Sequence, residues 1–343
     1  MVRNVTIVLS YGGVFMYSRP EQLLEKYSIT VKSVSKGREC YLCDTNLGAM
    51  ALREYKGSKE RAGFLEEMLR HLKASGLLVE RIMQTNEGEV LVEDEEERKF
   101  LLCENYSGAE CDTQNKEDMY MAVKMLAKLH NASANFQGVY PEMIRRNQNS
   151  LLDICERHNR EMKQVRNYIK NKKKKNSFER LFVSQCDQFL KKALSITESL
   201  KNVECEPELY GFCHGDYNQH SIVFSKQGVV IVGLDRFSYD LQIRDLANFI
   251  RKMMEKNNWD VELGRGLIKE YNEIHCLKEQ EKKYLYFFLA YPEKFWKLAN
   301  HYNSAHKAWL SERNVEKLEK VILQEEKREA FLALLFCEGI GYT

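Results

Sequence analysis

The chain has 343 residues, 44% of them hydrophobic, with 52 Lys and Arg against 50 Asp and Glu, so its net charge is only +2. This length allows two domains or lobes with buried cores, and the balanced charge argues against nucleic acid as a partner. The opening stretch MVRNVTIVLSYGGVFMYS is mildly apolar but has polar interruptions and a single basic residue. We therefore expect neither a signal peptide nor membrane insertion.

The N-terminal part predicts a small lobe built mainly of strands. Apolar and polar residues alternate between Ile29 and Glu54, with turn signals at Gly37 and Gly48, which indicates an antiparallel meander. The period becomes helical in SKERAGFLEEMLRHLKASG, where Gly76 is suited to end the helix. A strand pair around an acidic turn follows in GEVLVEDEEERKFLLCENYSG. We place this small lobe at residues 1–107.

From Lys116 onward the patterns are mostly helical, which predicts a larger lobe over residues 108–343. Two short strands, HSIVFS and GVVIVGL, interrupt the helices. The basic run Lys172–Lys175 is interpreted as a solvated linker rather than an anion site, because no aromatic or glycine-rich segment accompanies it. The aromatic stretch from Tyr284 to Trp309 has helical spacing and is interpreted as core, with a pocket for a cationic substrate as the alternative.

Ten cysteines are scattered without the spacing of a disulfide framework, so we expect reduced thiols and a cytoplasmic protein. Cys40 and Cys43 form a C-x-x-C, but the sequence has no second pair of this kind. Zinc binding or redox chemistry is therefore the less favoured interpretation of these two residues.

The segment FCHGDYNQHSIVFSKQGVVIVGLDRFSYD, residues 212–240, carries the clearest signs of chemistry. A His-x-Asp, a β-hairpin and a second aspartate come after a strand-rich lobe and a connector at Glu104–Gly108, in the order found in protein-kinase-like phosphotransferases. The series resembles the aminoglycoside and choline kinase branch of that fold. GLDRFSYDLQIRDLANFIRKMMEKNNWD and YPEKFWKLANHYNSAHKAWLSERNVEKLEKVILQEE resemble, more closely, the CotS family of spore coat proteins. The resemblance implies an α+β fold with two lobes, a small β-rich N-lobe with one helix and a larger, mainly helical C-lobe.

The same resemblance gives roles to individual residues. Asp216 is the candidate catalytic base, and His214 braces its loop from behind. Arg53 stands where the family has the strand lysine that holds nucleotide phosphates, and its expected partner is Glu66 or Glu67 on the following helix. The candidate nucleotide-binding residues are Arg53, Glu67, Glu104 and Tyr106.

The metal-binding positions depart from the family pattern. Ser221 stands where the loop asparagine is expected, and Gly233 where the metal-bridging aspartate is expected. Glycine offers no ligand, and a serine hydroxyl is a shorter, neutral one. Asp235 either leans toward the missing ligand position or has a structural role, pairing with Arg236 or a loop amide. ATP and Mg²⁺ thus remain candidate cofactors with weakened binding, and Ser221 and Asp235 are the candidate metal ligands.

Two functions fit these residues. The favoured one is a CotS-like pseudokinase, a coat-associated binding or scaffold protein whose partners are spore coat proteins or a small-molecule ligand. It would be cytoplasmic during synthesis and then reside in the spore coat. The alternative is an active, atypical ATP-dependent phosphotransferase acting on a small-molecule or protein hydroxyl, in which Asp216, Ser221 and Asp235 hold a single metal ion.

Overall fold

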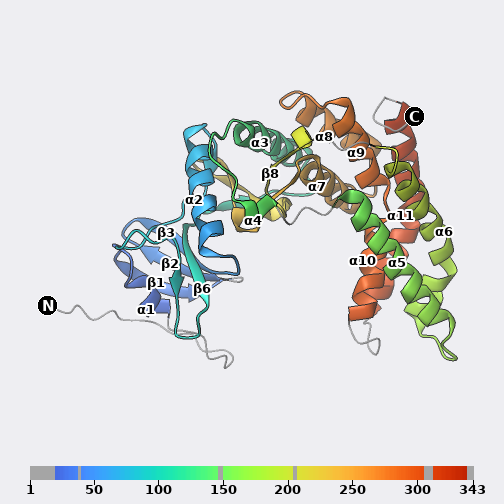
Figure 1. Ribbon diagram of the computed structural model, residues 1–343, viewed down its shortest axis with the longest axis horizontal. Helices are drawn as coiled ribbons and strands as arrows, with labels where there is room; N and C mark the ends of the chain where they lie inside the picture. The colour runs from blue at the N-terminus through green and yellow to red at the C-terminus, as the bar shows by residue number, and fades with distance from the viewer. Residues whose placement is uncertain (1–19, 38–39, 146–149, 204–206, 305–311, 338–343) are drawn as a thin grey trace. The chain divides into compact units, whose positions relative to one another are not determined.

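A computed structural model describes residues 20–37, 40–145, 150–203, 207–304 and 312–337 of the chain (Figure 1). The chain divides into two compact units, one formed by residues 1–146 and 212–239 and the other by residues 147–211 and 240–343. The first unit therefore joins the N-terminal strands to the later segment that contains the His-x-Asp. The lobe boundary expected near residue 107 stays a prediction. Among the helices that the structure describes, none is long and apolar enough to cross a membrane.

The first unit holds most of the strands. In chain order its elements are α1 (Pro20–Leu24), β1 (Val31–Lys36), β2 (Cys40–Thr45), β3 (Gly48–Tyr55), α2 (Lys59–Ala74), β4 (Leu78–Val79), β5 (Val92–Glu93), β6 (Lys99–Glu104), β7 (Gly108–Glu110), α3 (Lys116–Ala134), α4 (Glu142–Arg145), η2 (Gln219–Ser221), β9 (Ile222–Ser225), β10 (Gly228–Ile231) and η3 (Leu234–Arg236). Two further strands, β8 (Tyr210–Cys213) and β11 (Ser238–Leu241), contain points where the chain passes between units.

A five-stranded sheet with the order β1-β2-β3-β6-β5 forms the N-terminal part of this unit. Strands β1, β2 and β3 are antiparallel neighbours, and β5 pairs antiparallel with β6, so the expected meander and strand pair are both confirmed. One face of the sheet packs on residues from α1 and the segment after it, because alternate apolar side chains point to the same side. That core contains Leu23, Leu24, Tyr27, Met50, Leu52, Phe100 and Leu102.

Helix α2 lies beside this sheet in the first unit (Figure 1). Its N-cap Ser58 accepts a hydrogen bond from the backbone N–H of Arg61 at 3.2 Å, and its apolar face is buried. Gly76 has φ +86°, the left-handed conformation that ends many helices. The helix and its glycine stop are therefore where the sequence predicts them.

A second sheet, with the order β4-β10-β9-β7, contains the hairpin that lies between the His-x-Asp and Gly233 in the sequence. Strands β9 and β10 form the expected antiparallel hairpin, whereas β4 runs parallel to β10, with Leu78 opposite Val230 and Val79 opposite Ile231. Parallel strands end at the same edge of a sheet. The residues after Val79 and after Ile231 are thus brought to one edge, although they are far apart in sequence.

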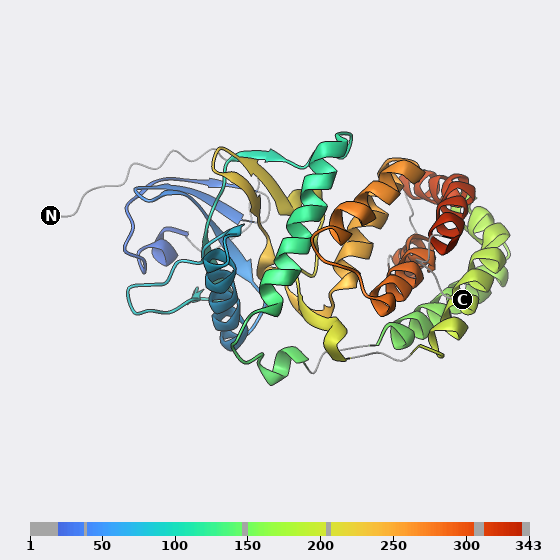
Figure 2. The same cartoon turned by 90° about the horizontal axis from the view of Figure 1, so that it is seen from above.

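The second unit is helical. Its elements are α5 (Leu151–Lys170), α6 (Ser177–Leu200), η1 (Pro207–Leu209), α7 (Ile243–Lys256), α8 (Val261–Asn272), α9 (Glu279–Ala290), α10 (Glu293–Ser304) and α11 (Glu312–Cys337). Helices α5 and α6 lie side by side, and α10 and α11 pack with them (Figure 2). Phe295 of α10 is fully buried and stacks on Phe182 and Phe189 of α6, which supports the core interpretation of the aromatic stretch; Trp309 lies outside the described residues.

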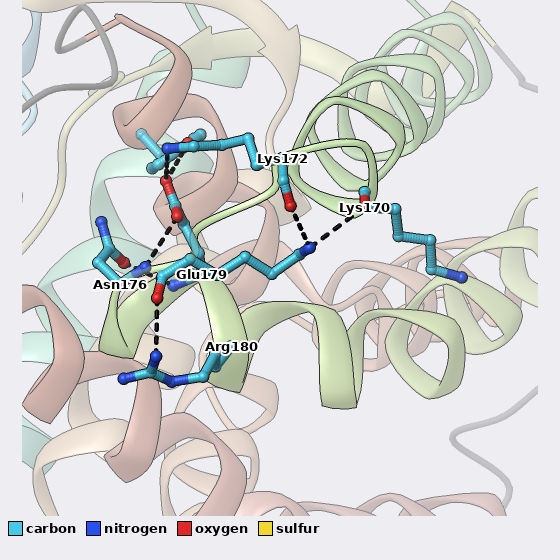
Figure 3. A network of polar contacts seen from close by, with 7 residues as sticks. Lys170, Lys172, Asn176, Glu179 and Arg180 are labelled. Atoms are coloured by element: carbon cyan, nitrogen blue, oxygen red, sulfur yellow. Dashed lines mark hydrogen bonds and ion pairs between the residues drawn. The ribbon is translucent and has the colours of Figure 1, made fainter.

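The basic run joins α5 to α6 through its own hydrogen bonds (Figure 3). Lys175 Nζ donates to the backbone carbonyls of Lys170 and Lys172, and Lys172 Nζ pairs with the buried Glu179. Asn176 and Glu179 form a capping box at the start of α6. Two of the four lysines therefore serve the connection itself, as the linker interpretation expects.

Candidate functional site

His214 supports the loop that carries Asp216. Its ring is buried, and Nε2 lies 2.9 Å from the carbonyl oxygen of Val232 at the end of the hairpin. Nδ1 accepts from the backbone N–H of Asp216 at 3.4 Å, which makes the neutral ring with its proton on Nε2 the form that satisfies both contacts. The histidine thus connects the loop to the strand that leads to Gly233.

Asp216 keeps a half-exposed carboxylate that is held by an arginine. Arg236 Nη1 lies 3.2 Å from Asp216 Oδ2. The structure thus gives Arg236 a partner in Asp216, while its pairing with Asp235, one of the two expected options for that aspartate, stays a prediction.

Ser221 is buried and takes part in its own loop. Its hydroxyl donates to the carbonyl oxygen of Asp216 at 3.2 Å and accepts from the backbone N–H of Asn218 at 3.2 Å. Asn218 Nδ2 also donates to the Asp216 carbonyl, at 2.7 Å. The hydroxyl is therefore used to close the turn that presents Asp216.

Gly233 occupies the slot of the expected metal-bridging aspartate, with φ +79°. A Cβ built there would meet only His214 Cε1, at 3.9 Å, so the absence of a side chain does not follow from crowding. Its backbone N–H donates to Glu80 Oε1 at 2.8 Å, and the N–H of Leu234 donates to the same oxygen at 3.2 Å. The carboxylate of Glu80, the residue directly after β4, therefore lies at the turn.

Glu80 also pairs with Arg53, which corrects the expected partner of that arginine. Arg53 Nη1 lies 2.8 Å from Glu80 Oε2, and the Glu80 side chain is only 3% exposed. On α2, Glu66 pairs instead with Arg70 at 3.4 Å, and Glu67 is exposed. The physical reason is the parallel β4–β10 pairing, which places Glu80 beside the Gly233 turn. The Arg53 side chain reaches the same carboxylate from β3. Glu80 raises the pKa of the Arg53 guanidinium, burial lowers it, and Asp235 adds to the rise.

Glu104 and Tyr106 lie at the end of β6, in the same unit. Tyr106 Oη donates to Glu104 Oε2 at 3.0 Å, and Glu104 pairs with Arg81 Nε at 3.3 Å. Burial, followed by the contact with Glu104, raises the pKa of the Tyr106 hydroxyl to about 12. Their assignment to nucleotide binding, like that of Glu67, stays a prediction.

Few side-chain oxygens around Gly233 are available to a divalent cation of the kind that ATP-dependent enzymes use. Position 233 has no side-chain oxygen, the Ser221 hydroxyl is engaged, and the Glu80 carboxylate is occupied by Arg53 and two amides. Across the described residues, no group of three or more His, Cys, Asp or Glu is placed to hold a metal ion. Mg²⁺ prefers several oxygen ligands in octahedral geometry. The metal roles of Ser221 and Asp235 have no support from these contacts and remain predictions.

Glu80 is not among the residues that the sequence predicts for this site. The only sequence signal is one acidic residue directly after the apolar pair Leu78-Val79 in GLLVERIM. Strand β4 has two residues, too few for a periodic pattern. Its parallel partner lies far along the chain, so the contact depends on topology.

Comparison with known proteins places the chain in a family. The family model described as "Spore coat putative kinase YutH" matches residues 20–335. Spore coat protein S of Bacillus subtilis (strain 168) is 25% identical over 313 residues, covering 89% of this chain and 88% of that protein. The expected resemblance to the CotS family is thus confirmed.

Solved structures show the same fold. An aminoglycoside phosphotransferase from Alicyclobacillus acidocaldarius superposes with a TM-score of 0.83 at 19% identity, covering 96% of this chain and 98% of that one. A spectinomycin phosphotransferase, solved with ADP and spectinomycin, gives 0.63 at 15% identity over 89% and 92%. These similarities confirm the predicted two-part, kinase-like α+β fold. The family match over most of the chain then identifies it: the protein belongs to the YutH family of spore coat proteins.

Proposed function

We propose that the protein is a pseudokinase of the spore coat, a binding or scaffold protein that uses a kinase-like fold without phosphoryl transfer. The observation that carries this proposal is the slot at Gly233. It has no carboxylate of its own, and its amide is bonded to Glu80, which also neutralises Arg53. Phosphoryl transfer needs charge neutralisation by metal and cation together, and the expected metal-bridging carboxylate is missing here.

Loss of the metal ion is expected to slow phosphoryl transfer strongly. A bound metal ion supplies several kcal/mol of transition-state stabilisation, and each 1.36 kcal/mol is about tenfold in rate. Asp216 is the candidate catalytic base, but its half-exposed carboxylate, paired with Arg236, does not replace the missing metal ligand. The alternative of an active kinase depends on Asp216, Ser221 and Asp235 holding one ion, and the Ser221 hydroxyl is bonded within its loop.

The place of action follows from the relatives. The matching family and the similar Bacillus subtilis protein are both described as spore coat proteins. We assign this chain to the same location, after synthesis in the cytoplasm, with coat proteins or a small-molecule ligand as partners. Fold relatives have been solved with ADP and spectinomycin, or with AMP-PNP and Ca²⁺. These relatives support a nucleotide pocket in this chain, and the metal-dependent part of its affinity is what we expect to be lost.

The first test is thermal unfolding with ATP, with and without Mg²⁺. A ligand at 100 times its Kd adds about 2.7 kcal/mol of stability, which a melting curve detects readily. We expect no Mg²⁺-dependent rise in the melting temperature. A clear rise that requires Mg²⁺ would contradict the proposal and favour an active kinase, whose phosphotransfer should then disappear in Asp216→Asn.

A restored variant sharpens the test. Gly233→Asp with Ser221→Asn returns both expected metal ligands; the space beside Gly233 admits a side chain, and the left-handed backbone there adds strain. We expect this double variant to gain Mg²⁺-dependent ATP binding that the natural protein lacks. Gly233→Asn with Ser221→Asn is the matched control, since it has the same backbone demand but no added charge. Equal binding by both variants would show that the lost carboxylate is not the cause.

A further inference from the structure

Two segments of strong and opposite charge lie in different units of the chain. Residues 163–175, the basic segment, contain seven Lys and Arg and no Asp or Glu. Residues 87–97, the acidic segment, contain seven Asp and Glu and no Lys or Arg. The net charge of the whole chain is only +2, so a strong local charge of each sign is hidden in a balanced total.

The basic segment forms the end of α5 and the connection to α6 (Figure 3). Lys172 pairs with the buried Glu179, and Lys175 Nζ donates to two backbone carbonyls at the end of α5 and in the connection. Lys173 and Lys174 lie between these two lysines and are exposed. In the part of the chain that the structure describes, neither has an ion-pair or hydrogen-bond partner. The flanking lysines thus fix the connection, and the two middle ammonium groups stay available.

The acidic segment ends in the tight turn between β5 and β6. Asp94 shapes this turn, because its Oδ1 accepts from the backbone N–H groups of Glu96 and Arg98 at 2.9 Å each. Glu97 has a left-handed φ of +60°, which is uncommon for a residue other than glycine. Glu95 and Glu97 are exposed, and among the described residues no group pairs with either carboxylate. A turn held by its own hydrogen bonds therefore presents two unpaired negative charges.

Charge complementarity identifies a partner for these surfaces. Charges of one sign that are clustered on a surface repel each other, and a surface of the opposite sign relieves this repulsion and steers the encounter. A polyanion would suit only the basic segment, and the acidic segment would repel it. A second copy of this chain suits both segments, because every copy carries the two surfaces with equal and opposite charge.

We propose that the protein associates head to tail with copies of itself: Lys173 and Lys174 of one copy contact Glu95 and Glu97 of the next. The contact joins two different surfaces, so it is heterologous and generates a ring or an open chain of copies. This inference goes beyond the proposed function, since the contact involves no residue of the candidate site and needs no nucleotide. An assembly of many copies suits a coat location, which does depend on the proposed function.

Sedimentation velocity of the full chain tests the association directly. The protein is compared from about 1 μM to about 1 mM, a range that covers weak contacts. Salt is set at about 0.01 M and about 1 M, where the Debye length is about 30 Å and about 3 Å. We expect the average mass to rise with concentration at low salt and to return to that of the 40.3 kDa chain at high salt. A monomer at every concentration, or an assembly that salt does not weaken, overturns the proposal.

Two charge-reversed variants locate the contact. Lys173→Glu with Lys174→Glu, and Glu95→Lys with Glu97→Lys, should each weaken association at low salt at least about tenfold, because like charges then face each other. In an equal mixture, each surface of one variant finds an opposite charge on the other variant, so association should return. A mixture that stays monomeric would overturn the pairing of these two surfaces.

Lys317→Glu with Lys320→Glu is the matched control. It changes the net charge by the same amount as the reversed lysine pair, on two exposed lysines of α11 in the same unit. The control should associate as the natural protein does, and an equal loss would overturn the proposal by showing that net charge governs assembly. Gln at the same positions replaces any reversed pair that fails to fold; unchanged association in these neutral variants would also contradict the contact.

Discussion

Gly215 and Gly233 share a left-handed backbone, with φ +83° and +79°, but differ in their surroundings. A Cβ at Gly215 would overlap the carbonyl oxygen of Arg236, whereas a Cβ at Gly233 has only His214 Cε1 nearby, at 3.9 Å. Gly215→Ala should lower the free energy of unfolding by about 3 kcal/mol or more, through backbone strain and overlap together. Gly233→Ala should lower the free energy of unfolding only by its backbone strain, about 1 kcal/mol.

Urea denaturation of the two variants measures this difference. Equal losses would mean that the close approach of Gly215 to the turn is not what fixes the loop. A large loss in Gly233→Ala alone would mean that the slot cannot accept any side chain, and the restored variant would then need a different design. The comparison thus also tests whether Gly233 was free to change without rebuilding the fold.

Some residues of the site could be predicted from the sequence, whereas the partners of others could not. Asp216, Ser221 and Gly233 could be singled out as candidates because they belong to one continuous segment with recognisable spacing. The partners of Arg53 and Arg236 were not found, since Glu80 and Asp216 reach them across strands and turns. Side-chain pairing depends on register and on the direction of each side chain, which spacing along the chain does not specify.

Helix α2 contacts the turn through Arg61, in addition to the ring contact between Phe64 and Phe237. Arg61 Nη2 donates to the carbonyl oxygen of Phe237, and its guanidinium lies 4.0 Å from the centre of the Phe237 ring. Arg61→Met should lower the free energy of unfolding by about 2 kcal/mol, because it loses a charge-assisted hydrogen bond and a cation–π contact. Arg70→Met is the control on the same helix, with a side chain that is 70% exposed.

Urea denaturation of both variants measures these losses, provided that the free energy of unfolding falls with urea at the same slope in each. The Arg70 variant should stay within about 0.5 kcal/mol of the natural protein. Equal losses from the two arginines would mean that the contact to Phe237 does not anchor α2. The helix itself was predictable from its apolar period and its Gly76 stop; the anchor was not, because Phe237 lies in a different segment of the chain.

For the whole molecule, buried thiols report separately on the two units. Cys103 lies in the first unit, and Cys155 and Cys186 lie in the second. Burial raises the pKa of all three thiols, that of the latter two to about 12, whereas Cys276 is exposed. Since the thiolate is the reactive form, iodoacetamide should label Cys276 at least about a hundredfold faster than the buried three, which react only on opening of their unit.

Labelling in the presence of ATP and Mg²⁺ then tests the proposed function at the level of each unit. Cys103 of β6 lies opposite Ala51 of β3, and Ala51 is two residues from Arg53 on the same strand. A ligand that binds a folded site lowers the rate at which that part of the structure opens. Peptide mass spectrometry should find the labelling of Cys103, Cys155 and Cys186 unchanged by Mg²⁺ and ATP together. Slowing confined to Cys103 would mean that the first unit binds the metal–nucleotide complex, because a general stabilising effect of the added salt would slow the second unit as well.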